Sequence, residues 1–316
     1  MSTMHQSVLL QESIAALAIN QNGIYIDGTF GRGGHASGIL CSLGPGGTVL
    51  AFDKDPEAIA VAGERFGDDA RFSIVHDSFA MMADEVAKRH WRGQVDGVLL
   101  DLGVSSPQLD DDARGFSFMR EGPLDMRMNP AVGVSASEWL MAVDESELVQ
   151  VLFDYGEERY ARRIAKAICQ ACRYGPIQTT KQLAELVAKA HPRWEKNKHP
   201  ATRTFQAIRI KINNELGDLH AVLKASLTVL KPGGRLVVIS FHSLEDRIVK
   251  KFMRKEARGD DFPPGVPVTT DMLNPHLKIV TKAIKPSKLE VETNVRARSA
   301  VLRVAECLGR ENESID

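Results

Sequence analysis

Short apolar runs alternate with helix-like stretches through the first hundred residues of the chain. The runs are rich in Val, Ile, Leu and Phe and end at polar residues, which is typical of buried strands. They lie at residues 23–27, 48–53, 72–76 and 95–101. Between two of them, residues 56–66 begin with Pro and place Ile59 and Phe66 on one face, which predicts a helix. This alternation predicts a parallel sheet with right-handed crossovers.

The strand pattern stops from about residue 104 to residue 216. Apolar positions in this stretch recur with helical spacing instead, and the predicted helices are residues 137–141, 145–154, 157–173, 180–190 and 201–216. Strand-like runs return at residues 234–240, 277–284 and 300–305. We therefore expect an α/β fold in which a helical insert interrupts one sheet domain, and the chain returns to complete the sheet.

The composition is that of an ordinary globular protein, with 43% hydrophobic and 26% charged residues. Its 316 residues suffice for about two domains. No apolar run approaches the roughly 18 residues that a membrane helix requires, so we expect no membrane partner. The N-terminal segment carries Glu12 and lacks a basic leader, so we expect no secretory signal. Four cysteines are too few for a disulfide scaffold and indicate a reducing, cytoplasmic location.

Charge is balanced overall but unevenly distributed. The 40 Lys and Arg residues nearly equal the 41 Asp and Glu residues, which excludes a globally basic nucleic-acid binder. Two local stretches are basic, at residues 189–211 and 247–258, whereas residues 108–158 are acidic. A basic stretch is equally typical of a phosphate-binding surface and of a solvated helix face, so both interpretations stay open.

A glycine-rich loop with the sequence DGTFGRGGH, residues 27–35, follows the first predicted strand. Glycines there allow a sharp turn and a close approach of the backbone to a ligand. The second strand ends at Asp53, where a carboxylate can accept hydrogen bonds from ribose hydroxyls. The pattern Gly31-x-Gly33-x-x-Ala36 also fits the dinucleotide fingerprint. The loop alone therefore allows either a nicotinamide dinucleotide or S-adenosylmethionine.

Acidic residues at the ends of three predicted strands distinguish these two ligands. They are Asp27, Asp53 and Asp101, on the first, second and fourth strands, and the first and fourth flank the topological switch point where such sheets bind ligands. Carboxylates there attract the sulfonium and ammonium groups of S-adenosylmethionine and repel a pyrophosphate. Helix capping is the alternative role for any single one of them. Phe79, after the third strand, is a candidate contact for adenine, although a lone Phe is more often a core residue.

The segment after the fourth strand contains the candidate catalytic residues. Asp101 precedes a polar segment that we expect to form a loop beside the reacting centre, with Ser105, Ser106 and Pro107. The exocyclic amino group of a base is a poor nucleophile, because its lone pair is delocalised into the ring. A carboxylate or carbonyl that accepts its N–H bonds draws electron density onto nitrogen and orients it for in-line attack. The same composition is also common in ordinary turns.

Sequence motifs spread over nearly the whole chain resemble those of one known family. They are HQSVLL (residues 5–10), YIDGTFGRGGH (25–35), DLGVSSPQLD (101–110), RGFSF (114–118), GPLDMRM (122–128), YGEER (155–159), HPATRTFQA (199–207), SFHSLEDR (240–247) and RARS (296–299). On these motifs the chain is similar to the RsmH (MraW) family of bacterial methyltransferases. Members of that family act on the N4 amino group of a cytidine in small-subunit (16S) ribosomal RNA.

The resemblance implies a fold, a cofactor and a substrate. The fold would be a Rossmann-like, class I S-adenosylmethionine-dependent methyltransferase domain of residues 1–105 and 215–316, with an inserted all-helical substrate-recognition domain of residues 106–214. The substrate would be a cytidine in the decoding region of 16S rRNA, within the small ribosomal subunit, and no metal would be needed. The implied cofactor contacts are Gly33, Gly34, His35, Asp53, Phe79, Asp101 and Gln108. Of these, His35 and Gln108 come from the resemblance alone.

Three further residues are candidates for binding the RNA substrate. Arg203 is a candidate phosphate contact, and Phe241 either stacks on a base extruded from the RNA or packs in the core. His242 is a poor candidate for a general base, because the proton can leave to water after methyl transfer, and is better suited to holding Phe241 or RNA. No Cys stands where it would attack the base ring, and Cys169 and Cys172 are expected to pack rather than to bind a metal.

We therefore expect a cytoplasmic enzyme that transfers the methyl group directly from sulfur to nitrogen, without a covalent enzyme intermediate. Two other functions stay open on the sequence. One is a NAD-dependent Rossmann oxidoreductase, and the other is a non-catalytic ribosome-assembly factor that uses the fold only to bind RNA. The sequence is compatible with a monomer and with a homodimer.

Overall fold

The computed structural model describes residues 7–193, 199–260, 262, 269 and 272–309. The chain divides into two compact units, which we call the α/β unit (Met1–Gly103 with Gly217–Asp316) and the helical unit (Val104–Leu216). The sequence pattern placed these junctions at residues 105/106 and 214/215. Residues 5 and 6 of the HQSVLL motif, and Lys196 and Lys198 of the first basic stretch, lie outside the described residues.

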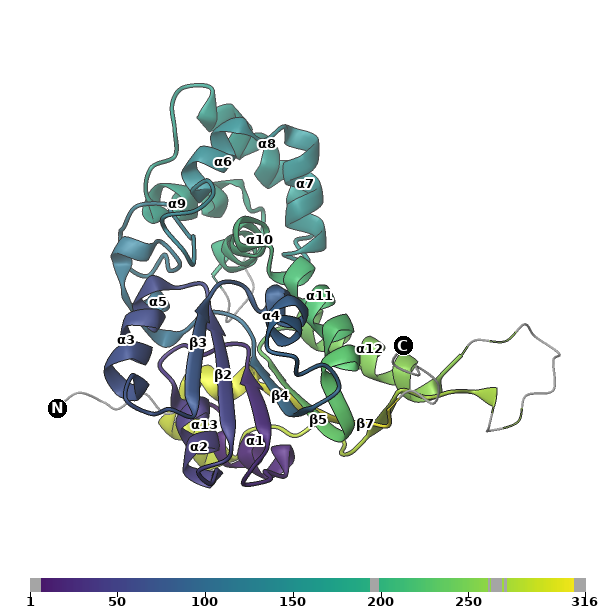
Figure 1. Ribbon diagram of the computed structural model, residues 1–316. Coiled ribbons are helices and arrows are strands. Elements are labelled where there is room, and N and C mark those ends of the chain that lie inside the picture. Colours follow the sequence, from purple (N-terminus) through teal and green to yellow (C-terminus); the bar gives the residue numbers. More distant parts are fainter. Residues whose placement is uncertain (1–6, 194–198, 261, 263–268, 270–271, 310–316) are drawn as a thin grey trace. The chain divides into compact units, whose positions relative to one another are not determined.

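A seven-stranded sheet forms the centre of the α/β unit in the described residues (Figure 1). Its strands are β1 (Ile24–Asp27), β2 (Thr48–Asp53), β3 (Phe72–His76), β4 (Val95–Asp101), β5 (Leu230–Ser240), β6 (Leu277–Ile279) and β7 (Val301–Cys307). The strand order is β3-β2-β1-β4-β5-β7-β6. Neighbours among β1 to β5 are parallel, whereas β7 runs antiparallel to both β5 and β6. The α/β prediction is confirmed, and the antiparallel strands are those formed when the chain returns to the sheet.

Both faces of the sheet are buried, as the continuous apolar runs require. Side chains alternate along each strand, so Val98 and Leu100 of β4 enter one core cluster whereas Leu99 enters another. The first cluster includes residues of α4 (Met82–Lys88), α11 (Glu215–Val229) and α12 (Ser243–Arg258). The second includes residues of α1 (Leu10–Leu17), α2 (Gly34–Ser42) and the 3₁₀ helix η4 (Val295–Ser299). These helices therefore cover the sheet on both sides.

The remaining helices of the α/β unit are α3 (Pro56–Phe66), the 3₁₀ helix η1 (Phe79–Met81) and α13 (Lys288–Thr293). The start of α3 is fixed locally: Pro56 stands at its first position, and the Asp55 carboxylate accepts a hydrogen bond from the Glu57 backbone N–H at 3.1 Å. Across the described parts of both units, no helix combines the length and apolar character needed to cross a membrane.

The helical unit contains short and medium helices around its own core. They are α5 (Ser106–Asp110), the 3₁₀ helix η2 (Asp112–Arg114), α6 (Ala136–Ala142), α7 (Glu145–Asp154), α8 (Ala161–Cys172), α9 (Thr180–Ala190) and α10 (Ala201–Asn213). Leu148, Ile164 and Leu183 of three successive helices are fully buried in that core. Cys169 and Cys172 of α8 pack against it, and burial raises the pKa of both thiols.

Four predicted elements differ from the structure, and one of them, the expected helix 157–173, begins only at Ala161 as α8. The expected helix 201–216 is two helices, because Asn214 adopts a left-handed conformation (φ 52°) that ends α10 before α11 begins. The expected strand 277–284 is only three residues long, followed by an isolated bridge between Ile284 and Leu302. Strand β5 begins at Leu230, ahead of the expected start, and its pairing with β4 is interrupted before Arg235.

Candidate functional site

Three carboxylates lie at the carboxyl ends of adjacent strands of the α/β unit. Asp27 is the last residue of β1, Asp53 of β2 and Asp101 of β4. Strand β1 lies between β2 and β4, so the three residues belong to one edge of the sheet. The strand order changes direction between β1 and β4, and such a switch point is where open α/β sheets bind ligands.

Asp27 is fully buried, with 0% of its surface exposed. Its Oδ1 accepts a hydrogen bond from the Thr29 backbone N–H at 3.1 Å, whereas no described residue donates to its Oδ2. Burial raises the pKa of Asp27 to about 6. Among the smaller effects, the charge of His35 and the Thr29 hydrogen bond oppose this rise. The chain therefore keeps a carboxylate oxygen at the switch point that lacks a donor among the described residues.

Asp101 and His35 form a second pair beside Asp27. The Nε2 atom of the buried His35 lies 3.5 Å from Oδ2 of Asp101, whereas Oδ1 of Asp101 is buried and has no hydrogen-bond partner among the described residues. Burial alone would lower the pKa of His35, but its hydrogen bond to Asp101 and the charges of Asp101 and Asp27 outweigh burial and raise it. Even with His35 protonated, two carboxylates and one imidazolium leave this group negative.

Asp53 is held by the backbone of two loops. Its Oδ2 accepts from the Gly31 N–H at 2.7 Å, and its Oδ1 accepts from the Asp55 N–H at 2.8 Å. Burial raises the pKa of Asp53, and these two hydrogen bonds oppose the rise. A carboxylate offers about four acceptor positions, so about two remain after these bonds. That is the number needed to receive the two hydroxyls of a ribose.

The glycine loop exposes bare backbone between β1 and α2. Gly31 and Gly33 have φ angles of 57° and 75°, which side chains rarely tolerate. A Cβ atom on Gly33 would lie 2.7 Å from Cζ of the buried Phe30, and a Cβ atom on Gly34 would lie 1.9 Å from Oγ of Ser7. Local geometry therefore requires glycine here whether or not a ligand is bound.

Phe79 begins the 3₁₀ turn η1 after β3 and is partly buried against the core. The residue before it, Ser78, belongs to a buried polar cluster. Oγ of Ser78 donates to Oδ2 of Asp218 at 2.6 Å, and Nζ of Lys54 lies 2.6 Å from the same oxygen. Asp218 of α11 thus ties the ends of β2 and β3 together, immediately next to Asp53 and Phe79.

Sequence reasoning missed this cluster and also missed Thr29. The Thr29 Oγ1 accepts a hydrogen bond from the Asp101 backbone N–H at 2.6 Å, so one residue links the ends of β1 and β4. A signal for Thr29 was its position two residues after Asp27 inside the loop. The signal for Asp218 was a carboxylate among the apolar residues of α11, but its partners lie far away in the sequence.

In the helical unit, the segment expected to be an open loop is instead the start of α5. Ser105 caps this helix: its Oγ accepts from the Gln108 N–H at 3.4 Å, and Oε1 of Gln108 accepts from the Ser105 N–H at 2.9 Å. Ser106 and Pro107 form the first turn. The loop prediction was wrong because a Ser-Ser-Pro-Gln sequence is also a capping box with Pro in the first turn.

Arg203 lies on α10, and its guanidinium donates to the backbone carbonyl oxygen of Glu157 at 3.2 Å. Both residues belong to the helical unit. This bond stabilises the turn at Glu157, which has a φ of 50°. The expected helix 157–173 therefore begins only at Ala161, as α8. The hydrogen bond to Glu157 gives Arg203 a structural role within the helical unit.

Phe241 and His242 lie between β5 and α12. The Phe241 backbone N–H donates to Oε2 of Glu245 at 2.9 Å, and its ring packs partly buried against the second core cluster. His242 caps α12, since its Nδ1 accepts from the Glu245 N–H at 3.5 Å and its Nε2 lies 3.0 Å from the Glu245 carboxylate. Both ring nitrogens of His242 thus face Glu245, which leaves little support for a general base.

The chemistry of the α/β site fits a cationic nucleoside. Asp27 and Asp101 each have a buried carboxylate oxygen to which no described residue donates, which suits positive charge, and Asp53 suits a ribose. The same carboxylates oppose a pyrophosphate. Within the described part of the chain, no group of three or more His, Cys, Asp or Glu residues is arranged to hold a metal ion.

Comparisons with known proteins agree with this chemistry. The profile of the MraW methylase family matches residues 2–308. A protein from a Marinomonas strain named ribosomal RNA small subunit methyltransferase H is 57% identical over 302 residues, which is 96% of each chain. A protein of the same name from Hydrogenovibrio crunogenus is 58% identical over 302 residues, again 96% of each. Among solved structures, an rRNA methylase from Streptococcus thermophilus covers 97% of this chain and 99% of its own, at 12% identity and a TM-score of 0.40. The chain belongs to the MraW methylase family.

Proposed function

We propose that this chain methylates the N4 amino group of one cytidine in the decoding region of 16S rRNA, within the small ribosomal subunit. It is an rRNA methyltransferase, and its cofactor is S-adenosylmethionine. One structural observation carries the proposal: the buried carboxylate oxygens of Asp27 and Asp101, without donors among the described residues, border the glycine loop at the switch point. The names of the two relatives support the RNA substrate, and a ribosomal substrate supports a cytoplasmic location.

Residues at the carboxyl edge of the sheet each bind a different part of the cofactor. The remaining acceptor positions of Asp53 receive the ribose hydroxyls. The backbone at Gly33 and Gly34 approaches the methionine part, which bare glycine permits. Asp27 and Asp101 face the positive charges, and His35 limits the excess negative charge before the cofactor binds. The ring of Phe79 lies against adenine.

Asp101 is the catalytic residue that we assign to the α/β unit. When bound, S-adenosylmethionine supplies an electrophilic methyl group that passes directly to the amino nitrogen. Oδ1 of Asp101 accepts an N–H bond of the cytosine amino group, which draws electron density onto nitrogen and orients its lone pair. The Thr29 hydroxyl fixes the backbone of Asp101 for this task. After transfer, the extra proton on nitrogen leaves to water, so no general base is required.

The helical unit recognises the RNA in this proposal. Arg203 of α10 contacts a phosphate of the RNA backbone. The first turn of α5, with Ser105, Ser106 and Pro107, positions Gln108, which contacts the cofactor. Phe241 of the α/β unit stacks on the extruded base, and His242 holds Phe241 in place through Glu245.

Incubating purified small ribosomal subunits with radiolabelled S-adenosylmethionine tests the activity, and mass mapping of the RNA identifies the nucleotide. We expect label in a single cytidine, at N4. Asp101→Asn keeps an acceptor oxygen but loses the negative charge, so it should lower kcat and also weaken cofactor binding. Asp101→Ala should lose further activity. Label at another nucleotide would overturn the N4 assignment.

Two rival functions give different results in the same experiments. A non-catalytic assembly factor would bind small subunits but transfer no label. A NAD-dependent oxidoreductase would bind NAD and not S-adenosylmethionine in calorimetry. Three carboxylates at one sheet edge argue against the second rival, because a pyrophosphate would meet like charge there.

A further inference from the structure

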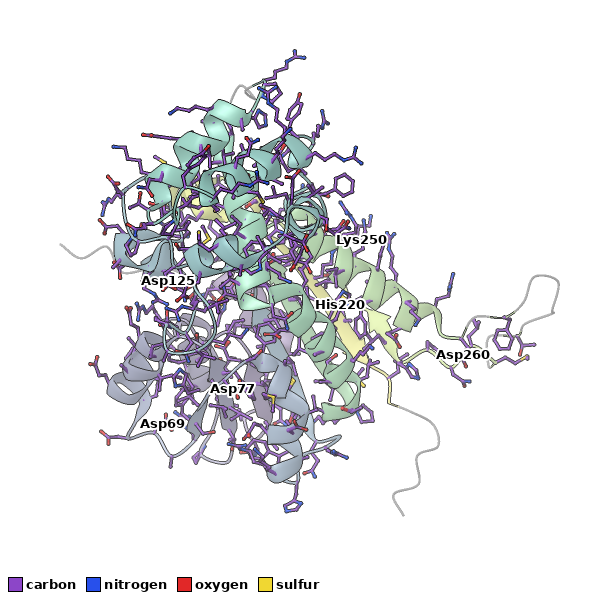
Figure 2. All side chains as sticks on the ribbon, turned by 90° about the horizontal axis from the view of Figure 1, so that it is seen from above. Asp69, Asp77, Asp125, His220, Lys250 and Asp260 are labelled. Atoms are coloured by element: carbon purple, nitrogen blue, oxygen red, sulfur yellow. The ribbon has the colours of Figure 1, made fainter. Side chains whose placement is uncertain are left out.

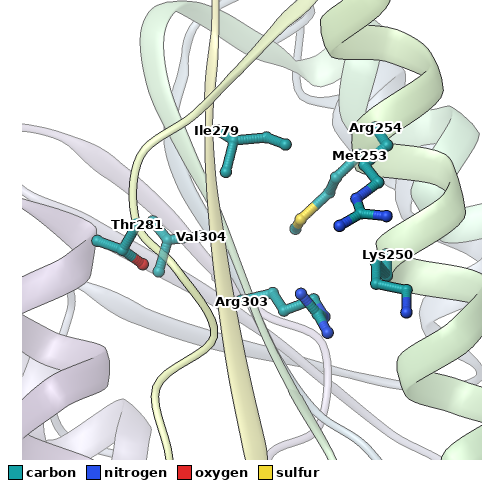
Figure 3. Close-up of a pocket in the computed structure, with 7 residues that line it drawn as sticks. All are labelled: Lys250, Met253, Arg254, Ile279, Thr281, Arg303 and Val304. Atoms are coloured by element: carbon teal, nitrogen blue, oxygen red, sulfur yellow. The ribbon is translucent and has the colours of Figure 1, made fainter.

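A groove lies on the α/β unit between α12 and the strands β6 and β7 (Figure 3). It is shallow and open to solvent, with an enclosed volume of only about 30 Å³. Seven residues line it: Lys250, Met253, Arg254, Ile279, Thr281, Arg303 and Val304. Three of the seven are cations and none is a carboxylate. The groove therefore offers positive charge above a floor that includes apolar side chains.

One acidic residue of α12 pairs with a groove cation, and the other two lie against residues outside the groove. Asp246 holds Arg303 through two hydrogen bonds of 2.7 and 3.0 Å. Glu245 faces Phe241 and His242, and Glu256 lies 2.8 Å from Nδ1 of His276. Asp246 therefore compensates Arg303, whereas Lys250 and Arg254 of the groove have no carboxylate partner among the described residues of α12.

The cations of α12 are correspondingly uncompensated. Among the described residues, no carboxylate forms an ion pair with Lys250, Lys251, Arg254 or Lys255. Lys250 projects from α12 (Figure 2), and Arg254 one turn further on is exposed. Unpaired cations gathered around a concavity form a preorganised anion site, because the site costs no broken ion pair when it is filled.

Arg303 adds a fixed guanidinium to this mobile pair of side chains. Its bidentate contact with Asp246 uses two of about five N–H donors and locks the plane of the group. A phosphate can therefore meet one oriented donor group and two flexible ones. The apolar floor of Met253, Ile279 and Val304 suits the sugar or base attached to that phosphate.

We infer that this groove binds a backbone phosphate of the small-subunit rRNA outside the target nucleotide. The inference rests on the proposed RNA substrate. Helix α12 starts directly after β5 at the carboxyl edge, and Lys250 lies seven residues beyond Ser243, which is roughly 10 Å along the helix axis. RNA whose target base sits at that edge can reach the groove a few nucleotides away.

An acidic protein segment is the alternative occupant, and the structure favours RNA over it. A peptide would gain most by adding a strand to the exposed sheet edge. The edge strand β6 has only three residues, Leu277–Ile279, which offers few backbone hydrogen bonds. Clustered cations beside a short edge strand therefore suit a phosphate better than they suit an acidic peptide.

The test compares two double charge reversals in the full-length protein. Lys250→Glu/Arg254→Glu reverses the groove. The matched control, Arg92→Glu/Lys224→Glu, makes the same change in net charge at exposed residues that do not line it. Binding to 16S rRNA and to small subunits is measured over a series of KCl concentrations. Cofactor affinity and the midpoint of thermal unfolding serve as folding checks.

We expect the groove variant to bind 16S rRNA about tenfold more weakly, and the slope of log Kd against log salt to fall by about 0.7, because one lost phosphate contact on a single strand removes about that much. The control should stay within about twofold of wild type. In methylation assays, KM for small subunits should rise while kcat stays unchanged.

Equal loss in both double variants would overturn the inference, as would wild-type RNA affinity in the groove variant. Weaker binding to small subunits with unchanged binding to naked 16S rRNA would assign the groove to a ribosomal protein instead. Failure of the proposed function gives a different result, because wild-type protein would then transfer no methyl label. The RNA-binding measurement does not depend on methyl transfer, so it tests the groove by itself.

Discussion

The ionisation of Asp27 should control how tightly S-adenosylmethionine binds. Burial raises the pKa of this carboxyl to about 6, so it is largely neutral at pH 5 and ionised at pH 8. A sulfonium or ammonium group gains its attraction only from the ionised form. Affinity should therefore fall as pH falls through about 6. The titratable groups facing Asp27 are His35, Asp101 and Asp53, and the raised pKa of His35 makes it the competing source of pH dependence.

The size of the effect follows from the population of the ionised form. If only that form binds, the apparent Kd rises about tenfold for each pH unit below the pKa, so binding at pH 5 is about tenfold weaker than at pH 8. Folding stability shows the opposite trend. Between about pH 4 and 6 the folded chain holds a proton on Asp27 that the unfolded chain has lost, so the free energy of unfolding falls as pH rises. A shift of about two units corresponds to ~3 kcal/mol.

Calorimetry of cofactor binding from pH 5 to pH 8 measures the first effect, and urea unfolding without cofactor measures the second. Asp27→Asn should abolish the pH dependence near 6, weaken binding at pH 8 and stabilise the free protein there by up to ~3 kcal/mol. His35→Gln should keep the step, which separates the two groups. A step that survives in Asp27→Asn and disappears in His35→Gln would refute the assignment.

Three further variants test the surroundings of the site. Asp53→Ala should weaken S-adenosylmethionine binding by about 1–3 kcal/mol in calorimetry, because two backbone donors and the ribose lose their acceptor; unchanged affinity contradicts the ribose assignment. Gly33→Ala should lower the urea midpoint, at a cost of about 1–3 kcal/mol, because its φ of 75° and the Phe30 ring leave no room for Cβ; a wild-type midpoint would mean that the loop relaxes freely. Asp218→Asn should raise the cofactor Kd about tenfold by loosening the turn that carries Phe79, on the scale of one charged hydrogen bond; a lower urea midpoint with normal affinity would show a purely structural role.

The sheet was predictable because each of its first four strands is recognisable from its own local sequence. β1, β2, β3 and β4 are short apolar runs ending at polar residues, and burial on both faces of the sheet makes such runs continuous. The three strand-end carboxylates were therefore placed correctly at the ends of β1, β2 and β4. Their roles toward a cofactor remain predictions that the variants above address.

Other features could not be predicted from the local pattern of apolar and polar residues. The Asp218 carboxylate meets Ser78 from 140 positions away, so the periodicity of α11 gives no hint of the bond. The break between α10 and α11 depends on one left-handed residue, Asn214, within an otherwise continuous helical pattern. The start of α5 shows the reverse difficulty, because its Ser-Ser-Pro-Gln sequence satisfies both a turn and a capping box.

Features that destabilise the free protein coincide at one edge of the sheet. Asp27 carries a buried carboxylate oxygen without a donor among the described residues, the buried His35 stands against Asp101, and Gly31 and Gly33 adopt left-handed backbone. If stability alone were selected, Asp27 would be replaced, since a neutral side chain there removes the cost of a buried charge. A cation that binds there supplies the missing partner for Asp27 and places positive charge beside Asp101. Stability lost in the free chain is thus recovered as cofactor affinity, which explains why the same positions violate the local rules of folding and satisfy the chemistry of a positively charged ligand.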